Sequence, residues 1–161
     1  MSEKTEKLLS LGLKQGFVGE TVMQSVERGV FKMKSSHFEN EDGTYHDEWM
    51  ADRTGGGQEI VETDGVSYTR VYAGGTISIN ALTEMGISIK DVMSFLKKNI
   101  LEGGEQTRLF ADYLPEPDGD WQYSYTILED EPKIPLTLGK EVIRYQGVLV
   151  FIHDFLITPV E

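Results

Sequence analysis

Two glutamates, Glu59 and Glu141, occupy matching positions in two similar stretches of the sequence. Residues 57–61 (GQEIV) and 139–143 (GKEVI) each place a glutamate two positions after a glycine and shortly before a two-residue turn. Strand alternation puts each glutamate on the face of an aliphatic residue, so both carboxylates are expected to be partly buried. A buried carboxylate must be hydrogen-bonded, ion-paired or protonated. The pair could share a ligand or act as acid and base, or each glutamate could only hold a loop through backbone N–H groups.

Aromatic side chains form a second set of candidates, because they recur at every second position of three predicted strands. Such spacing lines one face of a strand, and an arginine shares the face of the middle group. An aromatic wall with a few hydroxyl groups is typical of small-molecule pockets, and equally of a core between a sheet and helices. The residues assigned to a pocket are Tyr45, Trp49, Tyr68, Arg70, Tyr72, Trp121 and Tyr123.

The three histidines, His37, His46 and His153, include no pair at the spacing of metal ligands. The sequence also lacks cysteine, a Gly-x-Ser-x-Gly motif, a Walker loop and a Gly-x-Gly-x-x-Gly motif. We therefore predict no metal, no cofactor and no catalytic residue. His153 is assigned as a ligand contact, with an exposed or structurally satisfied histidine as the alternative.

The net charge argues against two classes of partner. The 161 residues include 27 acidic residues and 15 Lys or Arg residues, which gives a formal net charge of −12. An acidic surface repels phosphate backbones and anionic membranes, so neither nucleic acid nor a membrane is expected as a partner. The first residues lack a signal-type apolar core, which favours a cytoplasmic location. A small-molecule ligand is expected, and a homodimer is compatible with the sequence.

In the first half, turn and glycine signals divide the chain into short elements. Residues 3–29 have a helical pattern weakened by glycines, and a polar turn region is expected over residues 37–43. Residues 55–57, all glycine, are expected to be a flexible connector. Strands are expected over residues 44–49, 58–63 and 66–72. The Asp64-Gly65 pair joins the last two as a hairpin.

The second half begins with a well-marked helix. Ser88 is the expected N-cap, Asp91 completes a capping box, and Gly103-Gly104 ends the helix. Strands are expected over residues 121–127, 140–145 and 148–157, with Gln146-Gly147 as the last turn.

The two halves resemble each other. A constant offset of 82 residues separates Glu59 from Glu141 and Gly65 from Gly147. We interpret this as a duplicated α-β-β-β unit; the alternative is that unrelated hairpins share turn residues. The prediction is an α+β fold in a single domain over residues 1–161, with mainly antiparallel sheet or sheets and helices packed on one face. The pseudo-repeat halves cover about residues 20–80 and 87–157, after an N-terminal helical segment over residues 3–29.

These motifs resemble the bacterial family called domain of unknown function 5680. The residues that carry the resemblance are 35–36, 43–49, 57–61, 64–65 and 72–75 in the first half, and 119–123, 139–143, Phe151 and Phe155 in the second. Members occur alone or fused behind a helix-turn-helix domain in regulators. The resemblance implies a sensor or effector-binding module and carries no settled activity.

Three functions follow as alternatives. The first, which we favour, is a small-ligand-binding or effector-sensing module without catalysis, whose pocket lies between the halves. There Glu59 or Glu141 would fix a polar or cationic ligand beside aromatic rings. The second is a small enzyme with Glu59 or Glu141 as general base. The third is an acidic protein-interaction module.

Overall fold

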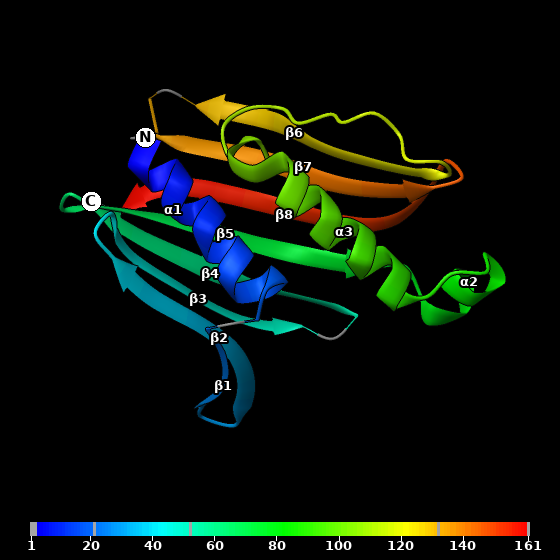
Figure 1. Ribbon diagram of the computed structural model, residues 1–161, viewed down its shortest axis with the longest axis horizontal. Helices are drawn as coiled ribbons and strands as arrows, with labels where there is room; N and C mark the ends of the chain where they lie inside the picture. The colour runs from blue at the N-terminus through cyan, green and yellow to red at the C-terminus, as the bar shows by residue number, and fades with distance from the viewer. Residues whose placement is uncertain (1–2, 21, 52, 132, 161) are drawn as a thin grey trace.

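The computed structural model describes residues 3–20, 22–51, 53–131 and 133–160. In these ranges eight strands form one antiparallel sheet in the order β1-β2-β3-β4-β5-β8-β7-β6 (Figure 1). Two meanders make up the sheet, and they join where β5 pairs with β8. The strands are β1 (Met23–Arg28), β2 (Phe31–Asn40), β3 (Gly43–Ala51), β4 (Thr54–Thr63), β5 (Val66–Thr76), β6 (Trp121–Glu131), β7 (Leu136–Tyr145) and β8 (Val148–Val160). The predicted α+β class with an antiparallel sheet is confirmed.

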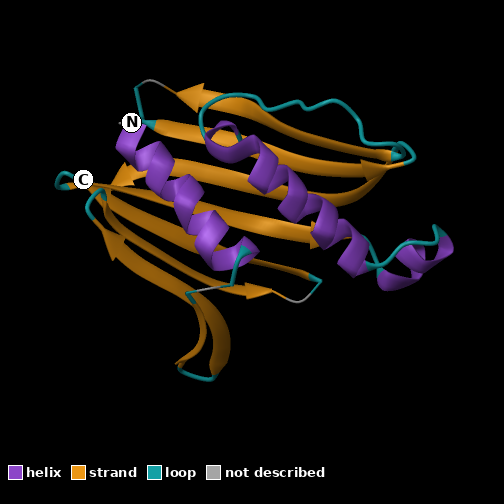
Figure 2. Ribbon diagram, viewed as in Figure 1, coloured by secondary structure: helices purple, strands orange, loops and turns teal. Residues whose placement is uncertain are grey.

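Two helices cross the same face of this sheet (Figure 2). They are α1 (Glu3–Leu13) and α3 (Ile89–Gly103), whereas the short α2 (Ile79–Glu84) lies beyond the ends of the strands. A π-helical turn, η1 (Lys14–Val18), continues α1, and a 3-10 turn, η2 (Gly104–Gln106), follows α3. Among the described residues, no helix has the length and apolar composition needed to cross a membrane.

The core lies between the sheet and these two helices. Leu8 and Leu9 of α1 pack with Tyr45 and Val61 of the first meander. The helix α3 directs its apolar stripe at the second meander, as its 3–4 spacing predicts. Its fully buried members are Val92, Leu96 and Ile100, which pack in one cluster with Tyr125, Ile143, Phe151 and Phe155.

Local sequence signals place the ends of α3 and the turns of two hairpins. The Ser88 side chain accepts a hydrogen bond from the Asp91 backbone N–H, and the Asp91 carboxylate accepts one from the Ser88 N–H at 2.8 Å. This is the predicted capping box. Asp64-Gly65 and Gln146-Gly147 have φ values of 53° and 78° and of 49° and 78°. Positive φ at both central residues is the geometry of a type I′ hairpin turn, so both predicted turns are confirmed.

Three predictions for the first half are wrong. The helical segment predicted over residues 3–29 ends at Val18, and Met23–Arg28 form the edge strand β1. The apolar residues of β1 have helical spacing, but pairing with β2 makes this segment a strand. Val30, at the tip of the hairpin between β1 and β2, is 91% exposed. Residues 37–40, predicted as a turn region, belong to β2. The glycines 55–57 are part of β4 rather than a flexible connector, because they pair with both β3 and β5.

Close packing of α1 on the sheet depends on Gly12. A Cβ atom at this position would overlap the ring of Tyr45. We expect Gly12→Ala to lower the free energy of unfolding by about 1–3 kcal/mol through overpacking, although alanine favours a helix by about 1 kcal/mol. Urea denaturation measures the change, with Lys7→Ala on the exposed side of α1 as the control. A Gly12→Ala variant as stable as the wild type would contradict this packing.

Candidate functional site

A buried ion pair joins Glu59 to Arg70 on the helix-covered face of the first meander. The Arg70 Nε and Nη2 atoms donate to Glu59 Oε2 and Oε1 at 2.5 and 2.7 Å. The Tyr45 hydroxyl donates to Glu59 Oε1 at 2.7 Å. Glu59 and Arg70 are each 1% exposed. The carboxylate of Glu59 is therefore fully engaged by partners within the protein.

The second meander contains the same arrangement around Glu141. The Arg108 Nε and Nη2 atoms donate to Glu141 Oε1 and Oε2 at 2.8 and 2.7 Å, and the Tyr123 hydroxyl donates to Oε1 at 2.6 Å. Burial alone would raise the pKa of Glu141, but the Arg108 guanidinium, with His153 nearby, lowers it to about 2. Glu141 is therefore an ionised, paired carboxylate at neutral pH.

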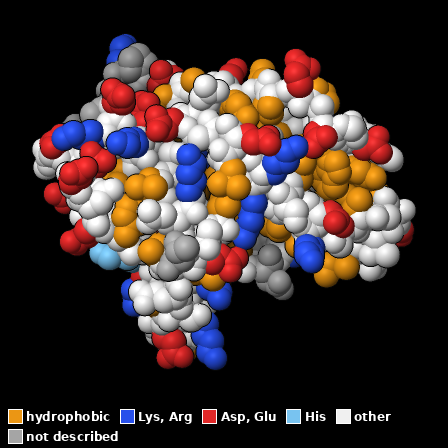
Figure 3. Space-filling model, viewed as in Figure 1, with side chains coloured by type: hydrophobic (Ala, Val, Ile, Leu, Met, Phe, Trp, Pro, Cys, Tyr) orange, Lys and Arg blue, Asp and Glu red, His pale blue; other side chains and the backbone are white. Residues whose placement is uncertain are grey.

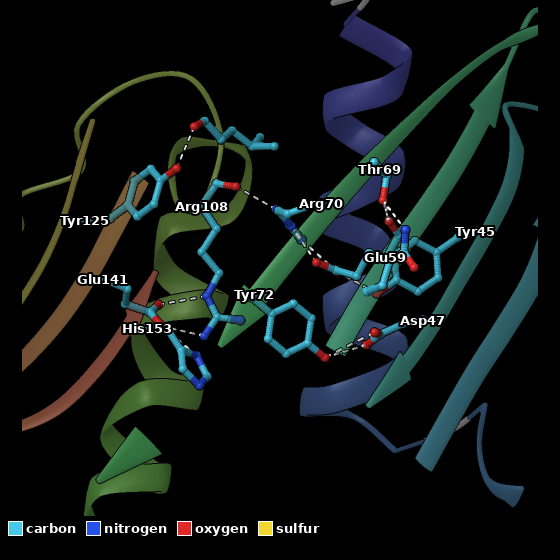
Figure 4. A network of polar contacts seen from close by, with 12 residues as sticks. Tyr45, Asp47, Glu59, Thr69, Arg70, Tyr72, Arg108, Tyr125, Glu141 and His153 are labelled. Atoms are coloured by element: carbon cyan, nitrogen blue, oxygen red, sulfur yellow. Dashed lines mark hydrogen bonds and ion pairs between the residues drawn. The ribbon is translucent and has the colours of Figure 1, made fainter. Parts of the chain in front are cut away.

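The two ion pairs are linked through Arg108 (Figure 4). Arg70 Nη1 donates to the Arg108 backbone carbonyl at 2.7 Å. The guanidinium carbons of Arg108 and Arg70 lie 5.0 and 5.8 Å from the centre of the Phe155 ring. Arg108 has a φ of 61°, a left-handed conformation that costs on the order of 1–3 kcal/mol in a non-glycine residue. These contacts hold the loop after η2 against the joint between the two meanders.

A cavity of about 180 Å³ lies beside this network, between the sheet, η1 and α3. It is more enclosed than two depressions of about 450 and 490 Å³, which open widely to solvent. Its polar lining comes from Asp47, Arg53, Tyr72, Arg108 and His153. Its apolar lining comes from Leu13, Phe17, Trp49, Met93, Leu96 and Phe151, and glycines of β4 and β5 complete the wall. An apolar cavity with a few convergent polar groups is the usual form of a small-molecule site.

The polar lining includes nitrogen atoms that have no hydrogen-bond partner within the described part of the chain. His153 Nδ1 is buried without one, and its ion-pair contact with Glu141 Oε2, at 3.7 Å, is longer than a hydrogen bond. Arg108 uses Nε and Nη2 on Glu141, and its Nη1 atom makes no hydrogen bond among the residues that the structure describes. Both side chains can therefore serve a bound molecule.

Asp47 is the carboxyl group of the cavity. The Tyr72 hydroxyl donates to Asp47 Oδ1 at 3.1 Å, and Figure 4 shows this pair on the far side of the Arg108 guanidinium from Glu141. Burial, assisted by the negative charge of Glu59, raises the pKa of Asp47 to about 8, although the Tyr72 hydrogen bond and the two arginines oppose the shift. Burial therefore favours the neutral form of Asp47, which can donate a hydrogen bond.

The predicted site residues fall into three groups. Trp49, Tyr72 and His153 line the cavity. Glu59, Arg70, Tyr45, Glu141 and Tyr123 form the ion-pair network behind it. Tyr68 and Trp121 lie elsewhere: Tyr68 beside Phe110 in a separate depression, and Trp121 against Phe95 and Tyr145 at ring distances of 5.1 and 4.6 Å.

Three polar residues of the cavity wall, Asp47, Arg53 and Arg108, were absent from the predicted site. Asp47 shares the strand face of Tyr45 and Trp49, and that alternation is a signal for a residue that faces the cavity. Arg108 lies in an irregular segment after α3, where no periodicity indicates its direction. Within the described ranges, no group of three or more His, Asp or Glu side chains could hold a metal ion.

Comparison of the chain with family models, with curated proteins and with solved structures found no match. The resemblance to domain of unknown function 5680 therefore stays a prediction.

Proposed function

We propose that this chain binds a small, planar organic molecule in the cavity between its sheet and helices. The observation that carries the proposal is the His153 Nδ1 atom, which is buried in the cavity wall without a hydrogen-bond partner among the described residues. Arg108, in the same wall, has an Nη1 atom that makes no hydrogen bond there. Folded proteins leave few buried polar groups unpaired, since each costs about 1–3 kcal/mol. A ligand that supplies hydrogen-bond acceptors would recover this cost.

The size of the cavity supports a ligand of about one ring. Its volume is about 180 Å³, and an apolar cavity of roughly 150 Å³ holds benzene. A single ring with one small polar substituent therefore fits. Aromatic side chains on two sides, Phe17 and Phe151, suit a flat apolar body.

We also infer that the two meanders descend from a duplicated unit. In the sheet, Glu59 lies opposite Asp47 and Arg70, and Glu141 lies opposite Tyr125 and His153. In each meander a tyrosine hydroxyl from the neighbouring strand donates to the glutamate. The cavity then lies at the joint of the two units. Both glutamates pair with an arginine, but the residue opposite Glu141 on β8 is His153, whose Nδ1 atom has no hydrogen-bond partner among the described residues.

In this proposal Glu59 and Glu141 support the cavity and do not contact the ligand. Both carboxylates are occupied by guanidinium groups, and neither lines the cavity. The alternative of an acidic interaction surface has less support, because basic and acidic side chains are interspersed over the helix-covered face (Figure 3).

A titration with neutral rings tests the proposal. Toluene and benzyl alcohol are expected to shift the backbone amide resonances of Gly56 and Gly74 saturably in two-dimensional NMR spectra. Met93→Trp should weaken this binding at least tenfold, because the larger side chain fills the cavity. Leu101→Trp, which adds the same side chain at an exposed position of α3, should leave it unchanged. Absence of saturable binding, or equal binding by both variants, would overturn the proposal.

A further inference from the structure

The polar groups of the cavity restrict the chemical class of the ligand. Resting on the proposed function, we propose that the natural ligand is a small aromatic carboxylic acid, whose carboxylate is bound by the Arg108 guanidinium and the Asp47 carboxyl group in the cavity wall. The opposite class, an organic cation, is the one that aromatic rings beside two glutamates would favour. The contacts of the charged side chains around the cavity show which of these two ligand classes the cavity suits.

The first step concerns the charges that surround the cavity. Arg70 neutralises Glu59 through two hydrogen bonds, and Arg108 neutralises Glu141 in the same way. Neither carboxylate is therefore available to pair with a cationic ligand. What the Glu141 pair presents to the cavity is its cationic member, Arg108, with an unused N–H donor group at Nη1. A planar guanidinium with a free nitrogen suits a carboxylate oxygen.

The second step concerns Asp47, the remaining carboxyl group. The titratable and charged groups that act on it are Glu59 on β4, Arg70 and Tyr72 on β5, and Arg108 after η2, with its neighbour Tyr45 on β3. Burial and Glu59 favour its protonated form near neutral pH, with a pKa of about 8. The Tyr72 hydroxyl lies 3.1 Å from Asp47 Oδ1 and 3.4 Å from Oδ2, so its hydrogen bond goes mainly to Oδ1. A proton on Oδ2 can then be donated to a ligand.

The third step compares how each ligand class affects that proton. A carboxylate near Asp47 disfavours a second negative charge, so it keeps the proton in place and receives its hydrogen bond. A cation needs an ionised partner, so Asp47 must first lose the proton. The cation would also approach the positive Arg108. At pH 7 the cavity therefore selects an anion, and above pH 8 the preference weakens.

Three probes of nearly equal shape test the proposal: benzoate, benzamide and benzamidinium, which carry charges of −1, 0 and +1. Isothermal titration calorimetry on the full chain gives the dissociation constants at pH 7 and pH 9. We expect benzoate to bind at least tenfold more tightly than benzamide at pH 7, and benzamidinium to bind most weakly. From pH 7 to pH 9 benzoate should weaken about tenfold, because binding then requires uptake of one proton by Asp47.

The Asp47→Asn variant and the neutral probe serve as controls. The asparagine side chain keeps a hydrogen-bond donor at every pH, so the variant should bind benzoate equally at pH 7 and pH 9. Benzamidinium binding at pH 7 as tight as that of benzoate would overturn the proposal, and so would benzoate affinity that is the same at both pH values. Binding of benzamide with no preference for benzoate would overturn the ligand class and leave the proposed cavity function standing. Failure of all three probes together with the neutral rings would overturn both.

Discussion

The Asp47→Asn variant is expected to be more stable than the wild-type protein at neutral and alkaline pH, by roughly 2–4 kcal/mol at pH 9. The folded protein holds the Asp47 proton up to a pKa of about 8, against an ordinary value of 3.8. Between these two values the folded state binds more protons than the unfolded state. Wild-type stability therefore falls as pH rises from about 4 to about 8 and then levels off. An asparagine removes this dependence and keeps the polar contact with Tyr72.

Urea denaturation at pH 5, 7 and 9 measures this effect. The gain from Asp47→Asn should grow with pH across the series. Asp154→Asn on β8 is the matched control, because that side chain is exposed and pairs with Lys140 on the surface. It should change stability by less than about 1 kcal/mol, with little dependence on pH. An Asp47→Asn variant that is less stable at every pH would show that Asp47 is ionised and well paired in the folded protein.

Removing one member of the buried Glu141–Arg108 pair should strongly destabilise the protein. Arg108→Met leaves the fully buried Glu141 carboxylate without its cation, and we expect a loss of roughly 3–5 kcal/mol. Adding Glu141→Gln to the same chain removes the unpaired charge, so the double variant should recover at least half of that loss. Lys140→Ala, next to Glu141 but in an exposed pair, should cost less than about 1 kcal/mol.

Equilibrium unfolding measured at several pH values checks this prediction. Because the pKa of Glu141 is lowered to about 2, its stabilising contribution is present above its ordinary value of 4.5 and declines as pH falls toward 2. Arg108→Met should therefore lose its disadvantage progressively in that acid range. Losses that simply add in the double variant would indicate that Arg108 and Glu141 act independently and would contradict the ion-pair description.

Local chemistry made much of this fold predictable. Ser88 and Asp91 form the expected capping box, and Asp64-Gly65 and Gln146-Gly147 form the expected turns, because each signal involves residues within a few positions of one another. The edge strand Met23–Arg28 was not predicted, since its apolar spacing resembles a helix and only pairing with Phe31–Asn40 makes it a strand.

The site was predictable in part for the same reason. Strand alternation puts Tyr45 and Trp49 on one face of one predicted strand and Tyr72 on one face of another. All three lie in the cavity wall or the network behind it. Arg108 could not be found this way, because it reaches Glu141 from 33 positions away in an irregular segment. Glu59 and Glu141 are paired within the protein through tertiary contacts, which local sequence signals do not specify.

The most direct test of the ligand cavity is a set of intermolecular NOEs between benzyl alcohol and protein methyl groups. We expect NOEs from the ring protons to the methyl groups of Leu13, Met93 and Leu96, which line the cavity. NOEs confined to Ile77 and Leu149, in the open depression beside β8, would contradict the account, and so would a complete absence of NOEs at saturating benzyl alcohol.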